Sequence, residues 1–161
     1  MITEAEFSSS YRELVPVIAR FFARRVASEF VEDLCSDTFE IAWKKRNQAP
    51  KGAELPWLYR IAGFVLSNHR RKEGNRLANL FSTPLANSAP SAEELALTDL
   101  ALAEAWRKLS DRDQTILALV AFDGLSPSEL AIALEISVNA ASIRLSRARA
   151  RLSELLAASA S

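Results

Sequence analysis

The chain has 161 residues, which suits one ordinary domain or two small ones at about 100 to 200 residues per domain. Its 20 basic and 20 acidic residues balance, and 25% charged with 49% hydrophobic residues is typical of a folded protein, so a large multidomain enzyme and a wholly disordered chain are excluded. Because only four glycines and six prolines occur among many alanines and leucines, an all-α fold is predicted.

Three amphipathic helices are predicted in the N-terminal half. Apolar residues recur every three or four positions over residues 11–26 and again over residues 31–45. A turn rich in proline and glycine follows at residues 50–56, and a third helix is predicted over residues 57–72. Three such helices can bury their apolar faces against one another in a small bundle.

The periodicity stops after Lys72. Residues 73–90 contain three asparagines and two prolines together with Gly74, a composition typical of turns and linkers. We therefore predict two small helical domains joined by a flexible linker: a three-helix N-terminal bundle over residues 1–72, a linker over 73–95 and a C-terminal domain over 96–161.

Two helices are predicted at the start of the C-terminal domain. The first extends from near Ser91 to Leu109. Ser110 then resembles a helix cap, and the helix that it begins runs to about Phe122. Gly124 ends this helix, because glycine readily adopts the left-handed conformation of a helix end.

A helix-turn-helix is predicted next. Ser126, Pro127 and Glu129 place a cap, a helix-starting proline and a capping acid at the beginning of a short helix over residues 127–134. After a tight turn, Ser137 caps a long helix of roughly twenty residues, about 30 Å in length. A short helix, a tight turn and a long helix are typical of the DNA-binding helix-turn-helix motif.

The long last helix has an apolar stripe and a polar surface. Ala141, Leu145 and Ala148 are spaced by four and three residues, so this stripe can pack on the preceding helices. The other faces carry asparagine, serine and arginine, and no acid occurs between Val138 and Leu152. A solvated helix usually interleaves acids with its arginines, so the pattern favours a helix that enters a DNA groove over an ordinary surface helix of a bundle.

Charges are segregated along the chain. Residues 28–43 hold five acids and no base, residues 44–76 hold nine bases and two acids, and residues 137–156 hold four arginines and one acid. A charged run is often only a solvated helix face, but two basic blocks in separate domains favour a polyanionic partner.

Three segments in this order resemble the extracytoplasmic-function (ECF) sigma factors, the minimal two-domain members of the sigma-70 family. VEDLCSDTFEIAWKKR (31–46) is similar to the core-binding region of that family, PWLYRIAGFVLSNHRRK (56–72) to its promoter-melting and minus-10 segment, and residues 109–152 to its minus-35 reader. The resemblance implies a sigma factor that binds core RNA polymerase at the β′ coiled coil and the β flap, directs promoter-specific transcription initiation and opens promoter DNA. It also implies an anti-sigma factor as a partner.

Site residues follow from the same resemblance. The segment that docks on core polymerase carries Asp33, Leu34, Asp37, Thr38 and Glu40. The minus-10 segment carries Trp57, Tyr59, Arg60, Asn68, His69, Arg71 and Lys72. The minus-35 reader carries Ser137, Asn139, Ser142, Arg144, Ser146, Arg147 and Arg149. Within these sets, Trp57 is equally compatible with a core position and with a base-stacking platform.

Two substitutions depart from the family pattern. Gly63-Phe64 stands where many relatives have Arg-Asn, which removes a cation from the promoter-facing helix and adds an apolar ring. Ser142 replaces a longer polar side chain, so phosphate contacts by Arg144 and Arg147 are better supported than base readout by Ser142. Two other hypotheses stay open: a stand-alone helix-turn-helix DNA-binding regulator and a degenerate sigma-like protein-interaction module.

No enzyme, cofactor or metal is expected. The chain has no glycine-rich phosphate loop and one histidine, and its single cysteine, Cys35, allows neither an intrachain disulfide nor a zinc ligand set. The first residues lack the basic region of a signal peptide, and no apolar run approaches the roughly 20 residues of a membrane span. We therefore expect a cytoplasmic protein that does not bind membranes.

Overall fold

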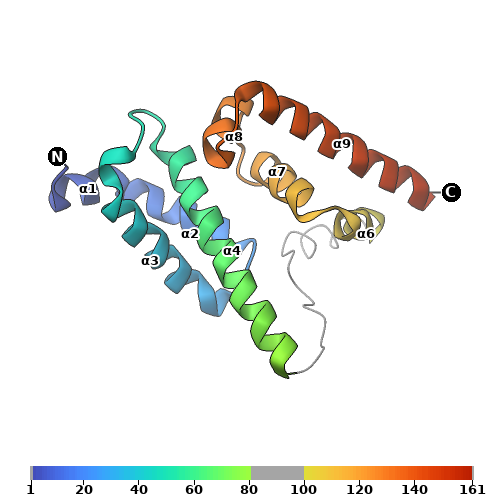
Figure 1. Cartoon of the computed structure of the whole chain (residues 1–161), viewed down its shortest axis with the longest axis horizontal. Coiled ribbons are helices and arrows are strands. Elements are labelled where there is room, and N and C mark those ends of the chain that lie inside the picture. Colours follow the sequence, from blue (N-terminus) through green and yellow to red (C-terminus); the bar gives the residue numbers. More distant parts are fainter. Residues whose placement is uncertain (1, 81–99, 161) are drawn as a thin grey trace. The chain divides into compact units, whose positions relative to one another are not determined.

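The computed structural model describes residues 2–80 and 100–160, and every regular element in these ranges is a helix (Figure 1). The described residues fall into two compact units, one up to residue 80 and one from residue 100 onward. An all-α fold with two small helical domains is thereby confirmed, whereas the boundaries predicted after residues 72 and 95 stay a prediction. None of the described helices is long and apolar enough to cross a lipid bilayer.

The N-terminal unit is a bundle built around α3. Its described elements are α1 (Glu4–Tyr11), the 3-10 turn η1 (Arg12–Leu14), α2 (Val15–Ala23), α3 (Ser28–Lys44), the 3-10 turn η2 (Arg46–Gln48) and α4 (Glu54–Leu80). α3 packs against both α2 and α4 (Figure 1). Ile18, Phe22 and Leu58 are fully buried in this core, and the burial of such side chains is the main force that holds the helices together.

The single helix predicted over residues 11–26 is wrong, because the chain forms η1 and α2 there. Pro16 lies in the first turn of α2, where it has no N–H to donate and its ring obstructs a continuous helix. The additional helix α1 is capped by Thr3, whose hydroxyl accepts from the N–H of Glu6 at 3.2 Å while the Glu6 carboxylate accepts from the N–H of Thr3 at 3.4 Å. This capping box is visible in the sequence as Thr-x-x-Glu, a signal that the analysis of periodicity missed.

α4 is longer than the helix predicted over residues 57–72. It begins at Glu54, with Pro56 tolerated in its first turn, and it continues to Leu80 through residues that were assigned to the linker. A glycine costs about 1 kcal/mol in a helix, which a helix that is already packed over several turns can absorb. The rest of the predicted linker, and the predicted helix start near Ser91, lie outside the described residues.

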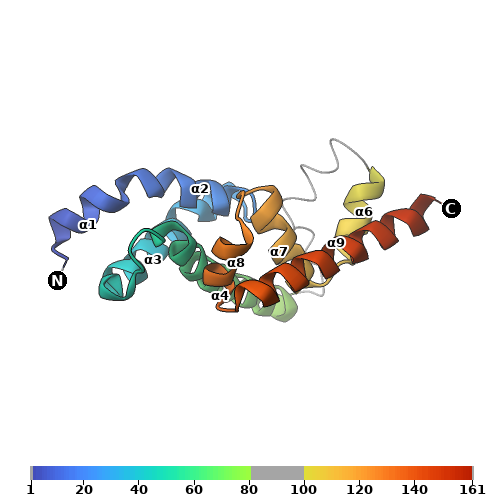
Figure 2. The same cartoon turned by 90° about the horizontal axis from the view of Figure 1, so that it is seen from above.

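The described part of the C-terminal unit contains four helices: α6 (Leu100–Lys108), α7 (Asp111–Ala121), α8 (Pro127–Leu134) and α9 (Val138–Ala160). α9 packs against each of the other three (Figure 2). The predicted apolar stripe of α9 faces inward, since Ala141 and Ala148 are fully buried and Leu145 nearly so. Leu130 of α8 is also fully buried, so the two helices of the helix-turn-helix share the core of this unit.

Three predicted helix-end signals in this unit are confirmed. Ser126 and Glu129 form a complete capping box at the start of α8, with bonds of 3.2 and 3.0 Å. Gly124 has a φ of 72°, the left-handed conformation expected after α7. The Ser137 hydroxyl accepts from the N–H of Ala140 at 3.0 Å and so caps α9. The short helix, the turn and the long helix therefore have the bounds that local chemistry predicted.

One ion pair joins the first turn of α7 to α9. Nε of Arg151 donates to Oδ2 of Asp113 at 2.5 Å, and Nη2 donates to Oδ1 at 2.8 Å. The Asp113 side chain is 8% exposed, whereas that of Arg151 is 52% exposed. The hydrogen bond from Arg151 holds the pKa of Asp113 below its usual range, although burial acts in the opposite direction. Arg151 therefore links α7 to α9, although in the sequence it looks like one more arginine of the basic last helix.

We expect Asp113→Asn to remove a stabilisation that depends on pH. Because the pKa of Asp113 is lower in the folded state than the unfolded value of about 3.9, its carboxylate stabilises the folded unit above that value, and this contribution is lost as the pH falls through the lowered pKa. The wild type should therefore exceed Asp113→Asn in urea midpoint near neutral pH, and the difference should shrink below about pH 4. A difference that stays constant down to about pH 3 would contradict this role of the carboxylate.

Candidate nucleic-acid and partner interfaces

α3 presents an acidic face, which we define as Asp33, Asp37 and Glu40. The three residues are spaced by four and three positions, so they share one side of the helix, and all three are exposed. Glu40 forms an ion pair with Lys44 at 3.2 Å. Neither Asp33 nor Asp37 has an ion pair with any other described residue. These two carboxylates are therefore surface anions that no described residue engages in an ion pair.

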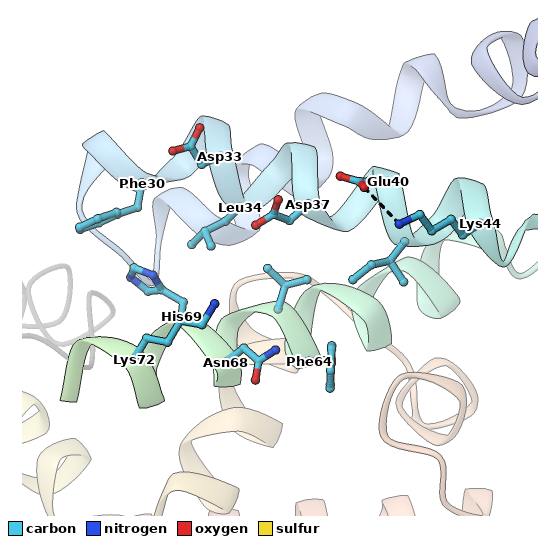
Figure 3. A pocket seen from close by; sticks show the side chains of 12 residues that line it. Phe30, Asp33, Leu34, Asp37, Glu40, Lys44, Phe64, Asn68, His69 and Lys72 are labelled. Atoms are coloured by element: carbon cyan, nitrogen blue, oxygen red, sulfur yellow. Dashed lines mark hydrogen bonds and ion pairs between the residues drawn. The ribbon is translucent and has the colours of Figure 1, made fainter. Parts of the chain in front are cut away.

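The acidic face borders a groove of about 350 Å³ between α3 and α4 (Figure 3). Apolar side chains from both helices line this groove, with Phe30 and Ile41 on α3 and Val65 on α4. Figure 3 shows His69 of α4 turned toward Phe30, and the centroids of the two rings lie 4.6 Å apart. The groove thus combines an apolar lining with a charged border, as many protein-binding surfaces do.

Two residues assigned to the polymerase surface, Leu34 and Thr38, are buried in this unit. Leu34 is 7% exposed and Thr38 is fully buried. The Thr38 hydroxyl donates to the backbone carbonyl of Leu34 at 2.8 Å, which satisfies the hydroxyl within the helix. Thr38 is thus packed inside the unit, whereas Leu34 contributes its remaining surface to the groove beside the three exposed acids.

The residues of α4 that we call its basic face are Arg60, Asn68, His69, Arg71 and Lys72, of which His69 turns toward Phe30 of α3. The two arginines and the lysine are exposed, whereas Asn68 and His69 are half-buried. The guanidinium group of Arg71 donates to Oδ1 of Asn68, which orders both side chains. No acid occurs between Glu54 and Glu73, so these five predicted minus-10 residues lie on a helix whose exposed charges are cationic.

Trp57 and Tyr59, which were assigned to the same surface, are each only 4% exposed, so the packing favours the core alternative that was left open for Trp57. The Tyr59 ring lies 5.6 Å from the ring of Phe21 in the core of the unit. The large exposed aromatic residue on α4 is Phe64, at 59% exposure. The helical spacing of apolar residues does not tell whether Phe64 is buried or exposed. In the sequence, Phe64 was therefore notable only because it departs from the family pattern.

α9 presents its polar residues outward. Among the predicted minus-35 residues, Arg144 is half-buried. The exposed ones are Ser137, Asn139, Ser142, Ser146, Arg147 and Arg149. Two apolar residues among them, Val138 and Ile143, are also exposed and were missed by the sequence analysis. Small polar groups near the start of the helix permit close approach to base edges, and the arginines beyond them are suited to phosphates. This arrangement fits a helix that docks in a major groove.

Two family models match the chain in the order of its units. Sigma-70 region 2 matches residues 10–76, and Sigma-70, region 4 matches residues 99–152. The RNA polymerase sigma factor NccH of Alcaligenes xylosoxydans xylosoxydans is 31% identical over 138 residues, which cover 80% of this chain and 74% of NccH. The RNA polymerase sigma factor CnrH of Cupriavidus metallidurans is 32% identical over 139 residues, which cover 78% of this chain and 73% of CnrH.

Two solved structures have a similar fold. CnrH, solved in complex with the cytosolic domain of CnrY, has a TM-score of 0.58 at 27% identity over 97% of this chain and 90% of CnrH. The sigma factor RpoE from Bartonella quintana, solved in complex with the anti-sigma factor NepR, has a TM-score of 0.63 at 23% identity over 94% of this chain and 96% of RpoE. Both similarities extend over nearly the whole chain.

Proposed function

The chain belongs to the ECF group of the sigma-70 family of RNA polymerase sigma factors, and we propose that three of its surfaces divide core-polymerase binding, minus-10 capture and minus-35 binding between them. These surfaces are the acidic face of α3, the basic face of α4 and the outer side of α9. The protein acts in the cytoplasm by binding, without catalysing a covalent step itself.

The acidic face docks on the β′ coiled coil of core polymerase. Asp33 and Asp37 supply exposed negative charge that no described residue engages in an ion pair, and charge complementarity accelerates the encounter with a basic partner and selects its orientation. Apolar side chains of the adjacent groove then provide contact area from which water is excluded. The charges thus steer docking, and apolar burial prolongs it.

The basic face of α4 holds the non-template strand of the melted minus-10 element. Its exposed cations follow one another along the helix and can track the phosphates of an extended strand. Asn68 is held by Arg71 in a fixed position, from which it can offer its amide to a base. Binding of the open strand lowers the free energy of the melted promoter and so favours opening.

The helix-turn-helix of the C-terminal unit binds the minus-35 element. α9 enters the major groove, Arg144, Arg147 and Arg149 bind phosphates, and the small polar residues near its start face base edges. We place the contact with the β flap on this unit as well. CnrH was solved in complex with the cytosolic domain of CnrY and RpoE in complex with the anti-sigma factor NepR, and we propose that an anti-sigma protein binds this chain.

The observation that carries the proposal is the sign of the exposed charge: acidic on α3 within the region 2 match, and basic on α4 and α9 within the region 2 and region 4 matches. The test combines the purified chain with bacterial core polymerase and measures transcription from a promoter library. We expect initiation that depends on both the chain and the promoter sequence. Tight duplex binding without initiation would favour a stand-alone regulator, and capture of a protein with neither activity would favour an interaction module.

A further inference from the structure

We propose that Phe64 is a stacking platform for an unpaired base of the non-template strand, an inference that rests on the proposed minus-10 role of α4. The ring is 59% exposed, so most of its apolar surface faces water. Packing of the N-terminal unit does not account for a large aromatic side chain at this position. A flat partner that covers the ring would account for it.

Phe64 lies in line with the basic face. Arg60 precedes it by four residues, and Asn68 and Arg71 follow it by four and seven, so these side chains share one side of α4. Figure 3 shows Phe64 and Asn68 pointing away from α3 and its acidic face. The ring is therefore placed between a cation at one end and the hydrogen-bonded Arg71–Asn68 pair at the other.

The neighbouring glycine leaves the approach to this surface open. Gly63 directly precedes Phe64, and a Cβ atom placed at Gly63 would have no heavy atom within 4 Å. Phe64 thus lies beside an unobstructed stretch of helix surface, because the residue before it has no side chain. A planar group as wide as a base can reach the ring from this side.

An unpaired base is the partner whose chemistry fits both the ring and the cations. The cations attract the phosphates of a strand, and an aromatic ring strengthens single-strand binding by roughly ten- to a hundredfold per stacked base. Bases in a duplex stack on one another and expose only their edges in the grooves, so the ring discriminates in favour of the melted strand. Stacking on Phe64 would replace part of the stacking that the promoter loses on opening.

A protein side chain in the groove between α3 and α4 is the competing partner, because Phe64 also stands at the border of that groove. The charges favour the strand. Arg60 and Arg71, on the same side of α4 as the ring, attract a polyanion, whereas Asp33 and Asp37 lie across the groove on α3. Figure 3 shows Phe64 directed away from α3, and the helical spacing places Arg60 and Arg71 on the same side of α4 as the ring.

The test uses holoenzyme assembled from the full chain and core polymerase, with forked DNA probes built from a promoter selected in the library. Single abasic sites are placed in turn at each unpaired minus-10 position. We expect one abasic position to weaken wild-type binding by about tenfold. Phe64→Leu should lose about as much on the intact probe and be insensitive to that abasic site, whereas Phe64→Trp should retain wild-type behaviour. Val15→Ala, a change at another exposed apolar residue of the same unit, is the matched control.

Two results would contradict the proposal that Phe64 stacks on an unpaired base. One is that Phe64→Leu binds every probe as the wild type does. The other is that Phe64→Leu weakens assembly with core polymerase and leaves the abasic pattern unchanged, which would assign the ring to a protein contact.

If the wild-type chain failed to assemble with polymerase at all, the proposed function would fail first. The full chain alone would then be compared on a short single strand and on its fully abasic counterpart, and a preference for bases that Phe64→Leu abolishes would still support stacking.

Discussion

Asp33→Lys combined with Asp37→Lys is expected to weaken binding to core polymerase by about tenfold or more at low ionic strength. Both carboxylates are exposed on α3 and neither is engaged in an ion pair with another described residue, so reversal replaces attraction by repulsion without breaking a packed contact. The loss should shrink as salt is raised, because exposed charges are screened. Titration of the labelled chain with core polymerase at several salt concentrations measures both effects.

The control for this variant is Glu4→Lys combined with Glu13→Lys. Both glutamates are exposed in the N-terminal unit but lie outside the acidic face, so the change in net charge is the same. The control should bind polymerase nearly as the wild type does, and both double variants should bind a minus-35 duplex normally. Equal loss of polymerase binding in the two double variants would show that net charge is responsible, and the docking surface would have to be sought elsewhere.

Arg144→Ala combined with Arg147→Ala should weaken binding to promoter duplexes by about tenfold or more at low salt, with little dependence on the base sequence. The reason is that each arginine is proposed to neutralise one phosphate and release its counterion. The slope of log K against log salt should therefore fall in magnitude by about 2, since each phosphate contact contributes about 0.9. Holoenzyme binding to the selected promoter and to a scrambled duplex, measured over a range of salt, tests this expectation.

Arg107→Ala combined with Arg112→Ala is the matched control for the α9 arginines. Both residues are exposed in the same unit, on α6 and α7, and their loss removes the same charge. This control should keep the wild-type slope. If the slope of the Arg144 and Arg147 variant is also unchanged, these side chains do not contact phosphates. A loss confined to one base sequence would instead give them a role in base readout.

The helix-turn-helix could be predicted to the residue because its signals are local. The cap at Ser126 acts through the backbone N–H of Glu129, and the cap at Ser137 acts through that of Ala140. Gly124 takes its left-handed conformation within the turn itself. Each of these signals involves groups at most a few residues apart, so no knowledge of the distant chain was needed to read them.

The faces of α3 and α4 were predicted less well. The family motifs lie within the matched sigma-70 regions, yet Leu34, Thr38, Trp57 and Tyr59 were assigned to surfaces and are buried. A motif marks a stretch of helix, whereas the side that meets solvent depends on which helices pack against it. α3 has neighbours on two sides, α2 and α4, and this leaves its acids as the exposed part of the segment.

Composition and spacing alone determined the helical class, the division into two small helical domains, the helix caps and the sign of the charge on each segment. These properties depend on residue type and on groups that are close along the chain. Only the tertiary structure decided that Arg151 is engaged by Asp113, 38 residues away, and that Phe64 instead of Trp57 carries the exposed ring. Such outcomes depend on which distant residues come into contact when helices pack, and local periodicity does not encode those contacts.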